Sequence, residues 1–300
     1  MGIFKHKENN PDVKEASAEA SSLHLKRKIY NILIVVSAIV FVVSVFFLGR
    51  RIYQYKQADK IYNDSRKYVE INPTDSASEN PTTDSSNASN EIVFPLKSFD
   101  YDSIHNMSPD TFGWIVVPSV SISYPLLQGT DNDYYLSHTY TGEENWNGSI
   151  YLDYRQNNDL SDRHVFIYGH KIENGSMFAE LLRYDDKDFF EHQKEANNHY
   201  FYIYLKDEVK VYEIFSVVDS QISDNPMLFK LSFPAKDNSE SCDEFLKLLK
   251  ENDLYDTGIQ AENTDTFVTL YTCQKPSPSQ IRHLVTGKLV KTVTYDEINS

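Results

Sequence analysis

The chain has 300 residues, enough for one large domain or two small ones, and 40% of them are hydrophobic. Acidic residues outnumber basic ones by 44 to 29, which gives a formal net charge of −15. A nucleic-acid binder should present a basic face, so this balance argues against a nucleic-acid partner. The 21 tyrosines and 17 phenylalanines are side chains that favour β-strands.

Residues 29–48 form an uncharged, mostly apolar run that is long enough for a helix to cross the hydrocarbon core of a bilayer. A cleavable signal peptide has a shorter apolar region that ends at small residues, whereas Gly49-Arg50-Arg51 follows here directly. We therefore expect an uncleaved, single-pass transmembrane anchor in contact with membrane lipid. Basic residues flank both of its ends, so charge alone does not orient it. The Ser/Thr-rich and acidic sequence that follows favours a cytoplasmic N-terminus and an extracellular globular body.

Residues 1–28 are expected to form a short cytoplasmic tail before the anchor, and the polar residues 1–25 of this tail are expected to be disordered. Residues 49–90 predict a helical stalk and then a disordered linker, because the stretch after Asn72 has too little apolar content to offset its ordering entropy by burial. The apolar residues of the stalk recur at helical spacing and are Ile52, Tyr55, Ala58 and Tyr62. The globular domain is expected to occupy residues 91–300.

The globular part is rich in short apolar runs separated by turn-forming clusters, a pattern typical of β-strands. The predicted strands are residues 113–117, 122–127, 149–153, 164–168, 200–205, 209–218, 266–272 and 282–293. Eight short strands within about 200 residues favour a closed barrel or a sandwich.

Two helical patterns interrupt the strands. Ser176 is expected to cap a helix over residues 177–184, and a second helix is expected over residues 239–252. Cys242 lies near the start of the second helix and is expected to be a bystander. Two cysteines are too few for a disulfide scaffold, although one bridge between Cys242 and Cys273 stays an alternative.

Cys273, His170 and Arg282 supply the parts that thiol acyl transfer needs: a nucleophile, a proton carrier and a group that stabilises developing negative charge. Taken singly, each has an ordinary explanation, as a buried small residue, a surface histidine or a solvated charge. Together the three residues support a catalytic site, because each lies at the boundary of an apolar run, where rigid scaffolds present reactive groups. Two prolines between Cys273 and Arg282 would let the chain turn back and set them side by side.

An ordered set of short motifs surrounds these residues, from about Asp100 to Val293. The motifs are residues 112–115, 124–129, 131–136, 148–155, 168–170, 175–179 and 269–273, together with Arg282. This set resembles the class B sortases, membrane-anchored cysteine transpeptidases of Gram-positive bacteria. The helix-bearing insertion before the Cys273 strand is also similar to class B rather than to the smaller class A.

The resemblance implies a mainly β fold, an eight-stranded, sortase-type closed β-barrel with peripheral helices, preceded by the transmembrane helix. It implies that Cys273 is the nucleophile, that His170 acts as general acid and then as general base, and that Arg282 holds the substrate carbonyl.

By the same resemblance, Tyr271, Thr272 and Asn132 are expected to bind substrate. Tyr271 stands where the family motif usually has a serine that helps to position the substrate. Whether this chain makes the same contact with substrate is therefore open. Asn132 has an alternative explanation as a turn residue within Asp131-Asn132-Asp133.

The function implied is cleavage of an Asn-Pro-x-Thr-type sorting signal near the C-terminus of exported proteins. The threonine carbonyl would pass through a thioester to an amine of peptidoglycan. Two alternatives stay open: an anchored cysteine peptidase that hydrolyses its acyl-enzyme, and a non-catalytic surface-binding or pilus-type module. We expect no metal and no organic cofactor, because no Cys/His cluster has ligand spacing.

Overall fold

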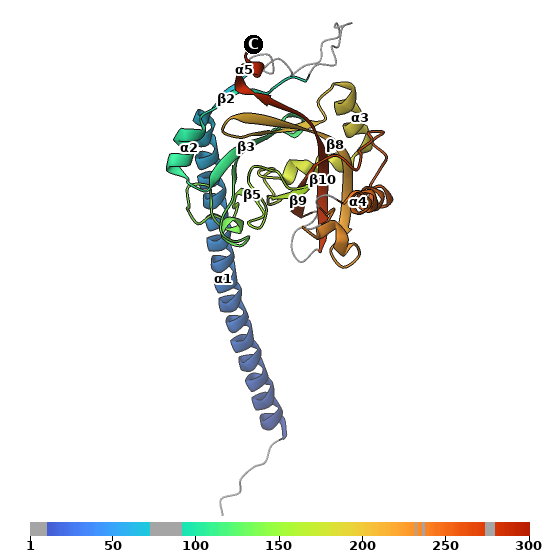
Figure 1. Ribbon diagram of the computed structural model, residues 1–300. Helices are drawn as coiled ribbons and strands as arrows, with labels where there is room; N and C mark the ends of the chain where they lie inside the picture. Colours follow the sequence, from blue (N-terminus) through green and yellow to red (C-terminus); the bar gives the residue numbers. More distant parts are fainter. Residues whose placement is uncertain (1–10, 73–91, 232, 236–237, 274–279) are drawn as a thin grey trace, which may run out of the picture. The chain divides into compact units, whose positions relative to one another are not determined.

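The structure is a computed structural model that describes residues 11–72, 92–231, 233–235, 238–273 and 280–300 (Figure 1). The chain divides into two compact units, Met1–Tyr53 and Gln54–Ser300. Helix α1 (Pro11–Ser65) makes up the described part of the first unit and continues into the second. Residues 11–25, which we expected to be disordered, are therefore helical, while residues 1–10 lie outside the described part.

The apolar stretch of α1 is the one helix among the described residues that is long and apolar enough to cross a membrane. Its most apolar window has a mean hydropathy of 3.0, and none of that window is buried by the protein. An apolar surface of this length has no favourable contact with water, so it fits a lipid environment.

The second unit is built on a closed barrel of eight strands, which confirms the predicted architecture. The strands lie side by side in the order β10-β8-β7-β3-β4-β5-β6-β9. They are β3 (Thr111–Val117), β4 (Ile122–Leu127), β5 (Ile150–Leu152), β6 (His164–Tyr168), β7 (Tyr200–Tyr204), β8 (Glu208–Gln221), β9 (Phe267–Cys273) and β10 (Ile281–Thr294). Each of the eight predicted runs overlaps one of these strands.

Side chains from all around the barrel fill its core, among them Trp114, Ile167, Leu270 and Val285. Strand β3 is buried along its whole length. Two pairings matter for the site. Strand β6 runs parallel to β9, and β10 runs antiparallel to β9. The C-terminal ends of β6 and β9 therefore meet the N-terminal end of β10 at one rim of the barrel.

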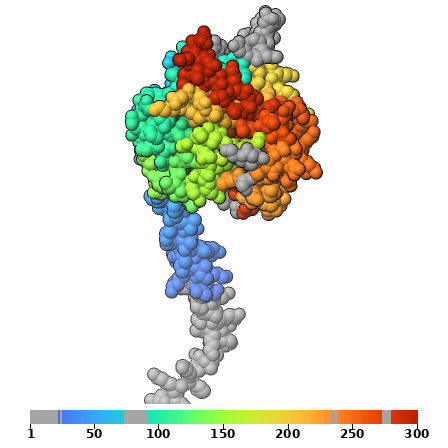
Figure 2. Space-filling model, viewed as in Figure 1, coloured from blue at the N-terminus to red at the C-terminus, as the bar shows by residue number. Residues whose placement is uncertain are grey.

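Helices and a small sheet surround the barrel. The remaining elements are η1 (Arg66–Tyr68), β1 (Val69–Ile71), β2 (Leu96–Phe99), α2 (Tyr101–Met107), η3 (Pro118–Val120), η4 (Tyr134–Leu136), η5 (Ala179–Asp185), α3 (Lys187–Glu195), η6 (Pro226–Phe229), α4 (Ser239–Asn252) and α5 (Tyr295–Ile298). Helix α4 has the predicted bounds and buries Cys242, Phe245 and Leu249. Figure 2 shows the C-terminal segment in dark red against the cyan surface near β2, where the Asn299 amide donates to the Lys97 carbonyl.

The predicted helix over residues 177–184 is wrong in type and start. The structure has the 3-10 helix η5, which begins only at Ala179, and no side chain caps it. Met177 has a φ of 58°, a left-handed conformation that cannot begin an α-helix. The Ser176 hydroxyl donates to the Asn174 side chain instead of capping a helix.

The barrel unit begins at Gln54, well before the expected boundary at residue 91. Ala58 and Tyr62 on the last turns of α1 are buried in the core, and the Tyr62 hydroxyl donates to the Gly148 carbonyl at 2.6 Å. Strand β1 then pairs with β2. The segment expected to be a stalk is thus part of the domain, and the expected linker at residues 73–90 lies outside the described part.

Removal of residues 1–90 is expected to destabilise the domain, whereas removal of residues 1–53 is not. The longer deletion strips Ala58 and Tyr62 from the core and leaves a void of aromatic size, which costs at least about 3 kcal/mol of unfolding free energy. Urea denaturation of the two truncated chains measures the difference. Equal unfolding free energies would show that the end of α1 contributes nothing to the fold.

Candidate active site

The backbone at the rim brings together the positions of the three proposed catalytic residues. Tyr168 at the end of β6 pairs with Tyr271 of β9, and His170 follows two residues later. Cys273 at the end of β9 pairs with Arg282 at the start of β10. The side chain of Cys273 lies outside the described part of the structure.

A cavity of about 250 Å³ opens at this rim. Its lining comprises Asn132, Leu136, Tyr151, Tyr168, Gly169, His170, Tyr271, Thr272 and Arg282. The cavity therefore gathers five of the six residues predicted for the site, and the sixth, Cys273, adjoins it through the backbone. Residues 132, 170 and 282 are far apart in sequence and meet here only because of the barrel topology.

His170 is held in place by its backbone and its ring. Its carbonyl accepts from the Phe178 amide at 2.9 Å, and its Nε2 lies 2.8 Å from the Leu136 carbonyl. A carbonyl can only accept, so Nε2 carries a hydrogen and Nδ1 is the atom left to gain or lose a proton. Gly169 permits this arrangement, because a Cβ there would lie 2.6 Å from the Phe178 ring.

The Arg282 guanidinium is half-buried, and among its bonds are two to described neighbours on β9 and β10. Its Nε donates to the Tyr271 hydroxyl at 3.0 Å, and one Nη donates to the Ile281 carbonyl at 3.3 Å. These bonds fix the plane of a rigid fork that is suited to binding oxygen atoms.

Thr272 and Asn132 differ in how their polar atoms are used. Thr272 is buried, and its Oγ1 has no hydrogen-bond partner within the described residues. The Asn132 amide is occupied at both ends, since Nδ2 donates to Asp153 and Oδ1 accepts from the Tyr154 backbone. Asn132 thus lines the cavity while tying its loop to residues 153–154, and the local turn is held instead by Asp131, which accepts from the Asp133 and Tyr134 amides. The contact of Asn132 with substrate stays a prediction.

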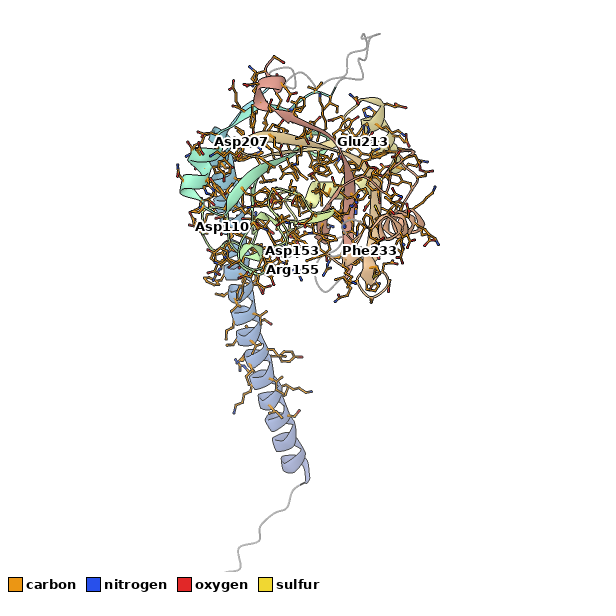
Figure 3. All side chains as sticks on the ribbon, viewed as in Figure 1. Asp110, Asp153, Arg155, Asp207, Glu213 and Phe233 are labelled. Atoms are coloured by element: carbon orange, nitrogen blue, oxygen red, sulfur yellow. The ribbon has the colours of Figure 1, made fainter. Side chains whose placement is uncertain are left out.

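Asp153 does not line the cavity but bonds to two residues that do, Asn132 and Tyr168, and the sequence did not single it out. Its buried carboxylate accepts two bonds from the Arg155 guanidinium and further ones from Asn132 and the Tyr168 hydroxyl. Figure 3 labels Asp153 and Arg155 side by side. Burial alone would raise the pKa of Asp153, but its bonds with Arg155, Asn132 and Tyr168 outweigh burial and lower it. The signal that could have revealed this pair is the Asp-x-Arg spacing at a strand end.

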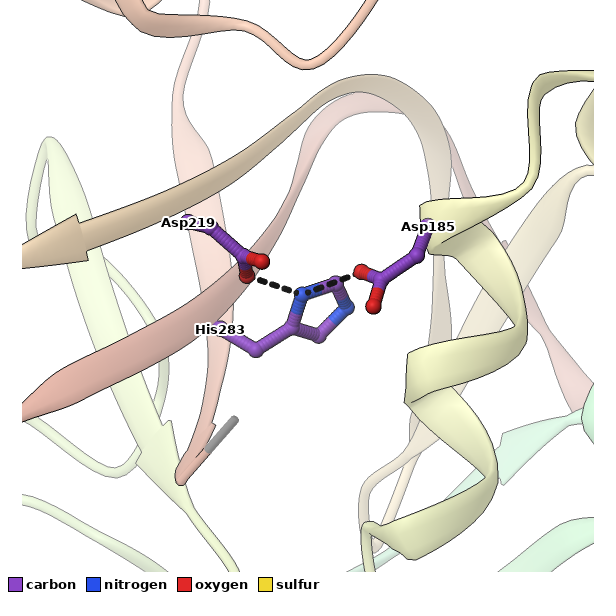
Figure 4. Close-up of side chains that lie close together, drawn as sticks. All are labelled: Asp185, Asp219 and His283. Atoms are coloured by element: carbon purple, nitrogen blue, oxygen red, sulfur yellow. Dashed lines mark hydrogen bonds and ion pairs between the residues drawn. The ribbon is translucent and has the colours of Figure 1, made fainter. Parts of the chain in front are cut away.

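His283, the neighbour of Arg282, is clamped between two acidic side chains (Figure 4). Its Nδ1 lies 3.1 Å from Asp185 and 2.9 Å from Asp219, and its Nε2 donates to the Leu181 carbonyl. These three ionisable groups lie close enough to hold a metal ion. Both ring nitrogens nevertheless face acceptors, which is the bonding of an imidazolium ion rather than of a metal ligand. The clamp ties η5 to β8 and β10 next to Arg282.

Stability is expected to fall as the pH rises through about 9, and replacement of His283 by glutamine should remove most of that fall. Burial lowers the pKa of His283, but Asp185 and Asp219 outweigh it and raise the pKa from 6.5 to about 9. The stabilisation is therefore complete below about pH 6.5 and lost above about pH 9, and it is on the order of 3 kcal/mol. Urea denaturation at pH 6 and pH 9.5 compares the two proteins. The same pH dependence in both would exclude the clamp as its source.

Comparison with known proteins gives one consistent family. A sortase-domain family model matches residues 115–290, more than half of the chain. A Sortase B from Listeria monocytogenes is 28% identical over 258 residues, which cover 84% of this chain and 92% of that protein.

Solved structures agree with this match. Sortase B from Clostridium perfringens has a TM-score of 0.56 at 30% identity, covering 63% of this chain and 99% of that chain. A Streptococcus pyogenes class B sortase involved in pilus biogenesis has a TM-score of 0.55 at 28% identity, covering 63% and 97%. Because the matched segment contains nearly all of the barrel and its rim, this chain belongs to the sortase family of cysteine transpeptidases, and within it to class B.

Proposed function

We propose that the rim cavity is the catalytic centre, with Cys273 as nucleophile, His170 as proton carrier and Arg282 as carbonyl-binding group. The observation that carries this proposal is the cavity itself. His170 and Arg282 both line it, and the register sets Cys273 directly opposite Arg282. A nucleophile, a proton carrier and an oxyanion stabiliser must lie within a few ångströms of one substrate carbonyl.

The first half-reaction forms a thioester. The Cys273 thiolate attacks the threonine carbonyl carbon of an Asn-Pro-x-Thr-type sorting signal, and the carbonyl π electrons move to oxygen. Arg282 and backbone N–H groups stabilise that oxyanion. The C–N bond then breaks, and His170 passes the proton on Nδ1 to the leaving amine. The Leu136 carbonyl keeps Nε2 protonated throughout, so the ring stays in one orientation.

The second half-reaction transfers the acyl group. An amine of a peptidoglycan cross-bridge or stem peptide attacks the thioester, His170 takes its proton, and the Cys273 thiolate leaves. The product is an exported protein joined to the cell wall by an amide bond. The apolar stretch of α1 would hold the enzyme in the membrane by a single pass, with its N-terminus cytoplasmic and the barrel outside. An enzyme and a substrate tethered to one surface meet at a raised effective concentration.

Incubation with Asn-Pro-x-Thr-Gly and Asn-Pro-x-Thr-Asn peptides, with and without an added amine, tests this proposal. Mass spectrometry should find cleavage after threonine and an amide of the added amine. Hydrolysis alone, with no amide at any amine concentration, would favour the anchored peptidase. No cleavage of either peptide would reject this class of sorting signal. The non-catalytic module finds no support in a family of transpeptidases.

A further inference from the structure

Tyr271 and Arg282 are diagonal neighbours on adjacent strands. In the antiparallel register of β9 and β10, Arg282 pairs with Cys273, and Tyr271 pairs with Leu284 two positions further on. Diagonal neighbours on one face of such a pair lie about 7–8 Å apart, so only long or aromatic side chains meet across this distance. The Tyr271 hydroxyl does span it and accepts from the Arg282 Nε at 3.0 Å.

Other aromatic rings hold the Tyr271 ring on several sides. Tyr168 meets it edge to face with centroids 5.1 Å apart, Phe229 does so at 5.8 Å, and Phe166 at 6.4 Å. Edge-to-face contacts of this kind restrict both the position and the tilt of a ring. The phenol oxygen is therefore a fixed acceptor, and the orientation of Arg282 follows from it.

We propose that Tyr271 is a positioning residue that sets the orientation of the Arg282 guanidinium in the cavity. This inference rests on the role proposed above for Arg282. A guanidinium has five N–H donors in one plane, so a fixed acceptor at Nε determines where the Nη groups point. Tyr271 acts through Arg282 rather than by contact with the reacting carbonyl.

A serine at position 271 could not do this. Its hydroxyl is one bond beyond Cβ and would fall short of a diagonal neighbour. It would also leave a void beside Tyr168 and Phe229, where the tyrosine ring now packs. The hydroxyl and the ring of Tyr271 therefore have separable roles: the hydroxyl orients Arg282, and the ring fills the wall of the cavity.

Tyr271→Phe in the full-length protein, held in detergent micelles, isolates the hydroxyl. Turnover of a sorting-signal peptide should fall about tenfold in kcat, with KM changed less than twofold, because a bond to a charged group is lost while the ring stays. A matched control is Tyr295→Phe, which loses a hydroxyl bond to the Leu205 carbonyl away from the cavity and should keep both constants. A wild-type kcat in Tyr271→Phe would overturn the inference.

A second measurement does not depend on turnover. The Nε–H proton of Arg282, observed by NMR with labelled arginine, should exchange with water faster in Tyr271→Phe than in the wild type, and should not change in Tyr295→Phe. Unchanged exchange in Tyr271→Phe would overturn the inference even if the activity fell.

An Arg282→Lys background separates this inference from the proposed reaction. Lysine has no Nε–H donor of this geometry, so adding Tyr271→Phe should lower its residual turnover less than twofold further. A further tenfold loss would assign Tyr271 a role independent of Arg282. Full activity of Arg282→Lys alone would instead show that the positive charge suffices and would reject a carbonyl contact through the planar guanidinium, whatever the NMR result for Tyr271.

Discussion

Replacement of Cys273 by alanine is expected to abolish acyl-enzyme formation and to lower peptide transfer by about 10⁴-fold or more. Removing the nucleophile removes the covalent route, and what remains is only the acceleration that binding and oxyanion stabilisation give to direct attack. The measurement is the yield of amide product by mass spectrometry, together with the protein mass after quenching with acid. The wild type should show a thioester adduct and the variant none.

Cys242→Ala is the matched control, because it removes the other thiol of the chain. Cys242 is buried in a hydrophobic cluster that also contains Phe245, Leu249 and Leu284, and burial raises the pKa of its thiol. Its loss should cost about 1 kcal/mol of unfolding free energy and leave transfer unchanged. Iodoacetamide should accordingly label the native wild type once, at Cys273. Transfer by Cys273→Ala, or its loss in a folded Cys242→Ala, would place the nucleophile elsewhere.

The strands could be predicted because they depend on local pattern, whereas the meeting of the proposed site residues depends on how the barrel pairs its strands and was expected from the family resemblance. Short apolar runs bounded by turn residues located all eight strands of the barrel. His170 follows the end of β6, Cys273 ends β9 and Arg282 lies near the start of β10, and the pairings of β9 with β6 and β10 bring these positions to one rim. The prolines between Cys273 and Arg282 predicted that the chain turns back and sets these two residues side by side. The strand register confirms this for their backbones, because Cys273 pairs with Arg282.

Other features depend on tertiary contacts that spacing does not reveal. The helical spacing of Ala58 and Tyr62 fits a free stalk as well as a buried helix, and it is the burial of both side chains and the bond from Tyr62 to Gly148 that distinguish the two. In the sequence, Asp153 is one polar residue at a strand end. Its role is evident only in the structure, where Arg155 and Tyr168 both donate hydrogen bonds to its carboxylate. The left-handed backbone conformation of Met177 could not be predicted from the sequence either, because methionine is not a residue type that favours a positive φ.

Replacement of Arg282 by lysine is expected to lower kcat/KM by about 10²–10³-fold, although the positive charge is kept. Lysine lacks the planar fork, so it cannot keep both the bond to Tyr271 and the bond to the Ile281 carbonyl while presenting donors to a substrate oxygen. Loss of a preorganised donor affects the transition state most, so the fall should appear mainly in kcat. Steady-state cleavage of the sorting-signal peptide measures it.

The matched control is Arg163→Lys, which removes another guanidinium bonded to backbone carbonyls, those of Asn263 and Asp265. This variant should lose stability and keep its kcat, because Arg163 is not among the residues that line the rim cavity. If Arg282→Lys were nearly as active as the wild type, charge alone would suffice, and a carbonyl contact through the planar fork would be wrong. If Arg163→Lys lost kcat to the same extent, the effect would be a general consequence of removing a bonded arginine.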